Sequence, residues 1–159
     1  MNEAHLHLAV NHFPIVGTIL GVGILVVGLV LKNNSVKNTA FFLFIIAAIF
    51  AAVSMATGEG AEELVEDMPS IGHEIIHEHE EMAEKLAIAL YVLAATSLVG
   101  LYLDYKKSAK AALVTYVALV IAAVAVFLAQ QTGRTGGEIR HTEIRSVAIP
   151  SDIQMKDKE

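Results

Sequence analysis

Residues 13–31 read FPIVGTILGVGILVVGLVL, an apolar run without a single charged residue. A helix of roughly 20 such residues is long enough to cross the hydrocarbon core of a bilayer. Three further runs, at about 41–57, 86–103 and 111–130, have a similar length and also lack charged residues. A soluble four-helix bundle would carry a polar stripe along each helix. The sequence therefore predicts an all-α fold, a bundle of four transmembrane helices.

The composition agrees with this fold and excludes several kinds of site. The chain has 159 residues, of which 55% are hydrophobic, and a mean hydropathy of +0.57. It contains no cysteine, which excludes disulfides, c-type haem attachment, cysteine-ligated iron–sulfur clusters and thiolate zinc sites. Basic clusters typical of nucleic-acid binding are also missing from the sequence. We expect one membrane domain over residues 1–145 and a polar tail over 146–159.

The positive charges predict the orientation of the bundle. Five lysines fall in two short loops between apolar runs, 32–40 and 104–110: Lys32, Lys37, Lys106, Lys107 and Lys110. The positive-inside rule places both loops in the cytoplasm of a bacterium. Both termini and the acidic, partly helical connector 58–84 then lie outside the inner membrane. The first run is not a cleavable signal peptide, because no Lys or Arg precedes it.

All seven histidines fall at the extracytoplasmic end of this topology: His5, His7, His12, His73, His77, His79 and His141. Residues 73–81 read HEIIHEHEE, and HEIIH matches the signature of zinc peptidases. At about 100° per residue, however, His73 and His77 share the polar face of the helix with the glutamates. Only His79 shares the apolar face, so the sequence favours His79 as a buried ligand and disfavours a peptidase.

A weak internal repeat accompanies these histidines. Histidine-rich segments precede the first and third runs, and a Thr-Gly pair follows the second and the fourth, at Thr57-Gly58 and Thr132-Gly133. Two parallel helical hairpins would bring both histidine segments to one end of the bundle. We expect the glycine-rich segment after residue 130 to leave the membrane and to lie over that end, with His141 able to reach the site.

Several segments together resemble an uncharacterised bacterial group of four-helix membrane proteins, the domain of unknown function 2231. They are HLHLAVNHFPIVG, TGEGAEELVEDMP, HEHEEMA and QTGRTGGEIRHTEIR, and the resemblance covers most of the chain. It implies His5, His12, His79 and His141 as candidate ligands. Members of that group are sometimes fused to Rieske-type iron–sulfur domains, which implies a redox setting. No such domain is found in this sequence, so the electron partner would be a quinone or a separate respiratory-chain protein.

These observations leave three functions open. The first is electron transfer by a redox-active metal centre, b-type haem, held between His12 and His79 with His5, His7 or His141 as alternatives. The second is a non-haem copper, zinc or iron site, built from those histidines with Glu62, Glu66 or Glu80. The third is a cofactor-free accessory subunit of a membrane complex. The sequence shows no nucleophile–base pair, so we expect an electron carrier or metal-binding protein rather than a stand-alone enzyme, and a homo-oligomer stays open.

Overall fold

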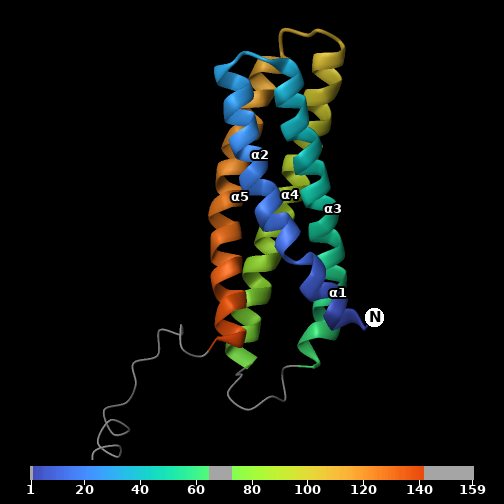
Figure 1. Ribbon diagram of the computed structural model, residues 1–159, viewed down its shortest axis with the longest axis vertical. Helices are drawn as coiled ribbons and strands as arrows, with labels where there is room; N and C mark the ends of the chain where they lie inside the picture. Colours follow the sequence, from blue (N-terminus) through green and yellow to red (C-terminus); the bar gives the residue numbers. More distant parts are fainter. Residues whose placement is uncertain (1, 65–72, 142–159) are drawn as a thin grey trace, which may run out of the picture.

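The computed structural model describes residues 2–64 and 73–141, which form helices joined by short loops. In chain order these are α1 (Glu3–Val10), α2 (His12–Val30), α3 (Asn34–Glu62), α4 (His73–Tyr105) and α5 (Ala111–Arg140). The helices α2 to α5 run alternately up and down as an antiparallel bundle (Figure 1). The predicted all-α architecture with four long helices is therefore confirmed.

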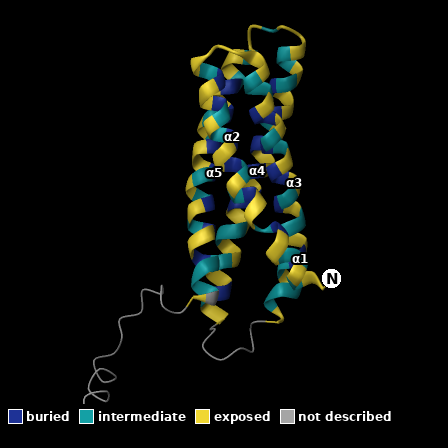
Figure 2. Cartoon of the chain, viewed as in Figure 1, coloured by how far each residue is buried: buried dark blue, intermediate teal, exposed yellow. Residues whose placement is uncertain are grey.

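The bundle has the surface of a membrane protein. Four helical segments are long and apolar enough to cross a bilayer, and α1 with α2 counts as one of them. Large apolar side chains cover their outward faces, for example Phe42, Ile49, Val120 and Phe127, each more than half exposed. Figure 2 shows this exposed surface along the whole length of the bundle. Such a surface is stable in lipid but not in water, since lipid solvates apolar side chains.

The lysine-bearing loops and the histidines lie at opposite ends of the bundle. The loops after α2 and α4 are at one end, and the start of α4, the end of α5, the end of α3 and α1 are at the other (Figure 1). The chain breaks its helix between α1 and α2 at Asn11, so that α1 packs against α3. We call the second end the histidine end.

Glycines on α2 and α4 let bulky side chains of α3 pack in the centre. A Cβ atom added to Gly100 would lie only 2.7 Å from Phe41 Cε2, and one added to Gly21 would clash with the Phe44 ring. Both phenylalanines are almost completely buried. Small residues at helix crossings allow this close approach, which supplies the dispersion energy that holds transmembrane helices together.

The two hairpins repeat the same burial pattern, with one constant offset between α2 and α4 and a slightly longer one between α3 and α5. On α2 the buried residues are Pro14, Thr18, Gly21, Leu25 and Gly28, and on α4 the matching residues Leu86, Leu90, Leu93, Ser97 and Gly100 are buried. On α3 and α5 the buried pairs include Ala40 with Ala118, Phe44 with Ala122, Ala47 with Ala125, Ala51 with Ala129 and Thr57 with Thr135. The internal repeat predicted from the sequence is thus visible in the packing.

Two helices extend further than the apolar runs predicted. The Thr-Gly pairs do not end them: α3 continues past Gly58 to Glu62, and α5 continues through Gly136 and Gly137 to Arg140. No described glycine has a positive φ angle, so these glycines serve close packing rather than helix termination. The segment after residue 130, expected to leave the membrane, is helical as far as Arg140. Residues 65–72, with Glu66, and the predicted tail 146–159 lie outside the described residues.

Candidate functional site

The first part of the candidate site is the imidazole of His7, which α1 places against the end of α3. His7 Nδ1 lies 3.0 Å from the carbonyl oxygen of Ser54 and 3.3 Å from the hydroxyl of Thr57. That hydroxyl donates its own proton to a backbone carbonyl one turn earlier on α3. Since a carbonyl only accepts, Nδ1 carries the proton and donates it. The lone pair of His7 is therefore on Nε2.

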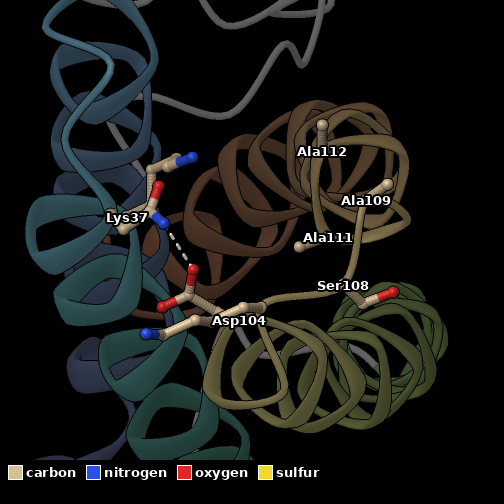
Figure 3. Close-up of a pocket in the computed structure, with 8 residues that line it drawn as sticks. Lys37, Asp104, Ser108, Ala109, Ala111 and Ala112 are labelled. Carbon is tan, nitrogen blue, oxygen red and sulfur yellow. Dashed lines mark hydrogen bonds between the residues drawn. The ribbon is translucent and has the colours of Figure 1, made fainter.

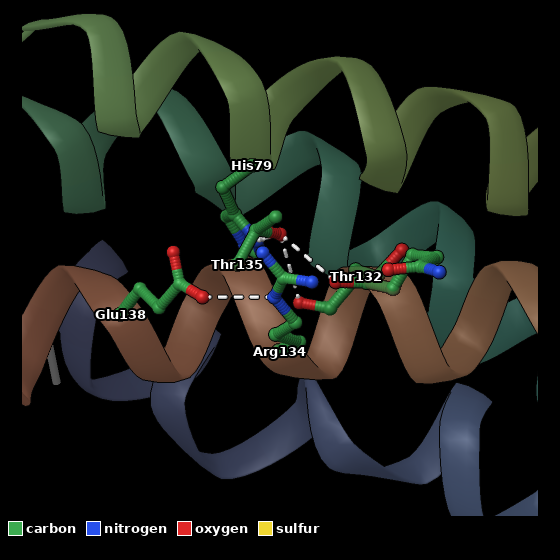
Figure 4. A network of polar contacts seen from close by, with 6 residues as sticks. His79, Thr132, Arg134, Thr135 and Glu138 are labelled. Atoms are coloured by element: carbon green, nitrogen blue, oxygen red, sulfur yellow. Dashed lines mark hydrogen bonds and ion pairs between the residues drawn. The ribbon is translucent and has the colours of Figure 1, made fainter. Parts of the chain in front are cut away.

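The second part is His79, which α4 places against α5 in the same manner. His79 Nδ1 lies 3.1 Å from the Thr135 hydroxyl (Figure 4), and His79 also hydrogen-bonds the backbone of Thr132. The Thr135 hydroxyl donates to the carbonyls of Gln131 and Thr132, each at 3.2 Å. It therefore accepts the Nδ1 proton, and the lone pair of His79 is again on Nε2. The prediction that His79 faces inward is confirmed, since its side chain is half-buried.

A glycine follows each of these threonines and gives the imidazole room. A Cβ atom on Gly136 would come within 2.9 Å of His79 Cε1, and one on Gly58 would be 3.9 Å from His7 Cε1. The structural counterpart of Thr57-Gly58 is therefore Thr135-Gly136, and not Thr132-Gly133 as the sequence suggested. The shift of three residues is nearly one helical turn, so both pairs lie on the same side of α5 and periodicity alone does not distinguish them.

The two imidazoles lie at the same end of the bundle, one on each hairpin, and their charges interact. His12, which the sequence favoured as the partner of His79, is exposed, and its Nδ1 contacts the amide oxygen of Asn11. The helix break at Asn11 causes this difference, because it turns α1 onto α3 and points His7 inward. The structure therefore directs His7, rather than His12, into the bundle.

The other predicted ligands lie around this pair. The exposed His5 imidazole contacts the Asn2 side chain, and the exposed His141 follows the last turn of α5. Glu62 at the end of α3 lies near Glu80 on α4, so these two predicted carboxylate ligands are neighbours.

The HEIIH segment has its motif histidines on the outside of the bundle. His73 and His77 are exposed, and His77 lies 3.9 Å from Glu80 and 3.6 Å from Glu81. The outward placement predicted from helical phase is confirmed. Among the residues that the structure describes, no group of three or more His, Asp or Glu side chains is arranged to hold a metal ion by itself.

The residues that the sequence did not single out are Ser54 and Thr135, which accept hydrogen bonds from the imidazoles. The internal repeat in the sequence indicates these residues when Thr57 is aligned with Thr135. The threonine hydroxyls of Thr57 and Thr135 also explain why small polar residues occur in an apolar bundle: each donates to a backbone carbonyl of its own helix and still accepts a second hydrogen bond.

Comparison with known proteins places the chain in a family. No curated protein and no solved structure matches it. A family model described as predicted membrane protein (DUF2231) matches residues 4–143. That range contains every histidine of the chain and all five helices except the first residue of α1. This protein, an all-α integral membrane protein with four long apolar helices, therefore belongs to the DUF2231 family of predicted membrane proteins.

Proposed function

We propose that the protein carries electrons through a redox-active metal centre, b-type haem, which His7 and His79 would hold. One observation carries the proposal: each imidazole donates its Nδ1 proton to oxygens of the neighbouring helix, and each Nε2 keeps its lone pair. Ligating histidines in metalloproteins are oriented by such a hydrogen bond from the second nitrogen. The two rings also come from the two halves of the internal repeat.

Two imidazoles match the needs of haem. A porphyrin supplies most of the donors to its own iron, so two imidazoles of the protein would be enough to hold it. A bound haem would supply one-electron chemistry. The chain itself would fix the ring orientation through Ser54, Thr57 and Thr135, and Gly136 would keep the space beside His79 open. His5, His12 and His141 stay alternative ligands.

We further propose that the histidine end faces outward from a bacterial inner membrane. The lysines of the two loops at the opposite end support this orientation through the positive-inside rule. The redox partner would then be a quinone or a respiratory-chain protein that reaches the outer surface.

A second candidate is a non-haem copper, zinc or iron site. The proximity of Glu62 to Glu80 favours it, because it brings two oxygen donors together at the histidine end. Such a site would need at least one further donor besides His7 and His79, and Glu66 was also predicted. A cofactor-free accessory subunit of a membrane complex is the third candidate function.

The visible spectrum separates these functions. The full chain is produced with added haem precursor, purified in detergent and reduced with dithionite, and iron, copper and zinc are measured in the same sample. We expect a Soret band and an α-band that are lost in His7→Ala and His79→Ala and kept in the control variant His73→Ala. A sample with metal but without these bands would favour the non-haem site. A sample with neither would contradict any metal centre.

A further inference from the structure

A polar cavity lies at the loop end of the bundle, on the opposite side from the histidines. It has a volume of about 340 Å³ and opens between the start of α3, the end of α4 and the start of α5. Figure 3 shows Lys37, Asp104 and Ser108 around it. Asn34 and Lys107 complete the polar lining. The cavity is independent of the proposed redox site, since none of its lining residues lies at the histidine end.

The charged groups in this cavity differ in whether they have a polar partner. Asn34 and Asn38 donate their amide N–H groups to the two oxygens of Asp104, at 2.6 and 2.8 Å. The carboxylate is therefore held by neutral donors rather than by ammonium groups. Within the described part of the chain, neither Lys37 nor Lys107 has a carboxylate at ion-pair distance, whereas Lys85 and Arg134 do. The cavity thus combines two unpaired ammonium groups with one carboxylate that already accepts hydrogen bonds.

Packing fixes the direction of the Lys37 side chain. A Cβ atom on Gly28 would lie 2.8 Å from Lys37 Cγ, so the lysine stem runs directly over the α2 backbone. The side chain is half-buried as a result. Lysine residues often bury their methylene groups in this way and present the ammonium group to a polar region. Lys37 is also one of the residues that line the cavity.

The cavity also lies at the level where lipid headgroups are expected. Tyr102 and Tyr105, in the last turn of α4, are 59% and 81% exposed, and Lys106 Nζ lies 5.8 and 5.9 Å from their ring centroids. Exposed tyrosines next to lysines mark the interface between the hydrocarbon core and water. A ligand with an acidic headgroup and acyl chains could therefore fill the cavity without leaving the bilayer.

We infer that this cavity binds the phosphate group of an anionic phospholipid. Lys37 and Lys107 would neutralise the phosphate. Basic pockets between transmembrane helices recognise lipid headgroups through this chemistry. A free phosphate ion has the same chemistry, so the experiment must separate the two sources.

The test compares two double variants of equal charge. The full chain is delipidated in neutral detergent and titrated with phosphatidylglycerol, and bound lipid is counted by native mass spectrometry. K37Q/K107Q removes both cavity lysines, whereas K106Q/K110Q removes two lysines of the same loop region that do not line the cavity. We expect the apparent Kd for phosphatidylglycerol to rise roughly tenfold or more in K37Q/K107Q and less than about threefold in K106Q/K110Q.

The outcomes are distinct. Weaker binding confined to K37Q/K107Q, with no displacement of lipid by excess inorganic phosphate, supports an anionic lipid. Displacement by inorganic phosphate supports a soluble phosphate ligand at the same residues. Equal weakening in both double variants, or in neither, overturns the site. If K37Q/K107Q does not fold, Ala112→Glu, which adds a carboxylate to the cavity wall, must weaken lipid binding in its place.

Discussion

His79 Nδ1 lies 3.1 Å from the Thr135 hydroxyl, and this contact joins α4 to α5 at the histidine end. His7 makes the equivalent contact with the end of α3, where the Ser54 carbonyl is 3.0 Å away. Each hairpin of the internal repeat therefore fixes one imidazole through its Nδ1 atom. Two equivalent imidazoles at the same end of a membrane bundle form the strongest candidate site of the described residues, and their support can be tested separately from any cofactor.

Replacing Thr135 with valine tests the hydrogen bond to His79. The substitution keeps the shape of the side chain but removes the oxygen that accepts from Nδ1. We expect the free energy of unfolding to fall by about 1 kcal/mol, the usual net contribution of such a bond. Thr132→Val is the matched control, because the Thr132 hydroxyl donates to the Leu128 carbonyl and not to a histidine. Unfolding in mixed detergent micelles measures both, and equal losses would contradict the assigned role.

Replacing Gly136 with alanine tests the space beside His79. The new Cβ atom would lie 2.9 Å from His79 Cε1, so the imidazole or the helix must shift. We expect a loss of roughly 1–3 kcal/mol, as for other overpacked sites. At Gly133 the nearest atom to a new Cβ is Ile15 Cδ1 at 3.6 Å, an ordinary contact. Gly133→Ala should therefore be neutral or stabilising, because alanine favours the helix. Stability as high in Gly136→Ala as in Gly133→Ala would show that His79 does not pack there.

Replacing Gly21 with alanine tests how a large side chain of α3 packs against a glycine of α2. The added methyl group would clash with the Phe44 ring, which is fully buried. We expect about 1–3 kcal/mol of destabilisation. Gly23→Ala, on the same helix with nothing within 4 Å of the new Cβ, is the control. A Phe44→Leu substitution in the Gly21→Ala background should recover part of the loss, and strict additivity in this double-mutant cycle would argue against direct contact.

Labelling of single cysteines tests the proposed orientation. The chain has no cysteine of its own, so one introduced residue gives an unambiguous signal. Ser35 and Glu63 are exposed at opposite ends of α3. A membrane-impermeant maleimide should label Glu63→Cys in intact spheroplasts and Ser35→Cys only after permeabilisation. The reverse pattern would place the histidine end in the cytoplasm and contradict electron exchange at the outer surface.

Much of the fold could be predicted because it depends on local properties of the chain. Apolar runs of spanning length require helices in a bilayer, since only a helix satisfies all backbone hydrogen bonds within one segment. The direction in which each side chain points around one continuous helix is equally local. It placed His79 inward, and His73 and His77 outward, and the structure confirms all three placements.

Helix ends and the spatial partner of each histidine could not be predicted in this way. Glycine after threonine stops many helices, but Gly58 and Gly136 stay helical where an imidazole from another helix packs beside them. The helical periodicity of α2 also cannot be extended back into α1, because the helix breaks at Asn11. This break decides that His7, rather than His12, points into the bundle, at the same end as His79.

The sequence by itself thus determined the membrane helices, their number, the position of the histidines at one end and the buried face of α4. Only the tertiary structure decided the register of the repeat, the inward placement of His7 at the same end as His79 and the cavity between Lys37 and Lys107. The physical reason is the range of the forces. Hydropathy and helical periodicity act along a few turns of one segment, whereas side-chain contacts between helices depend on how residues far apart in the chain pack together.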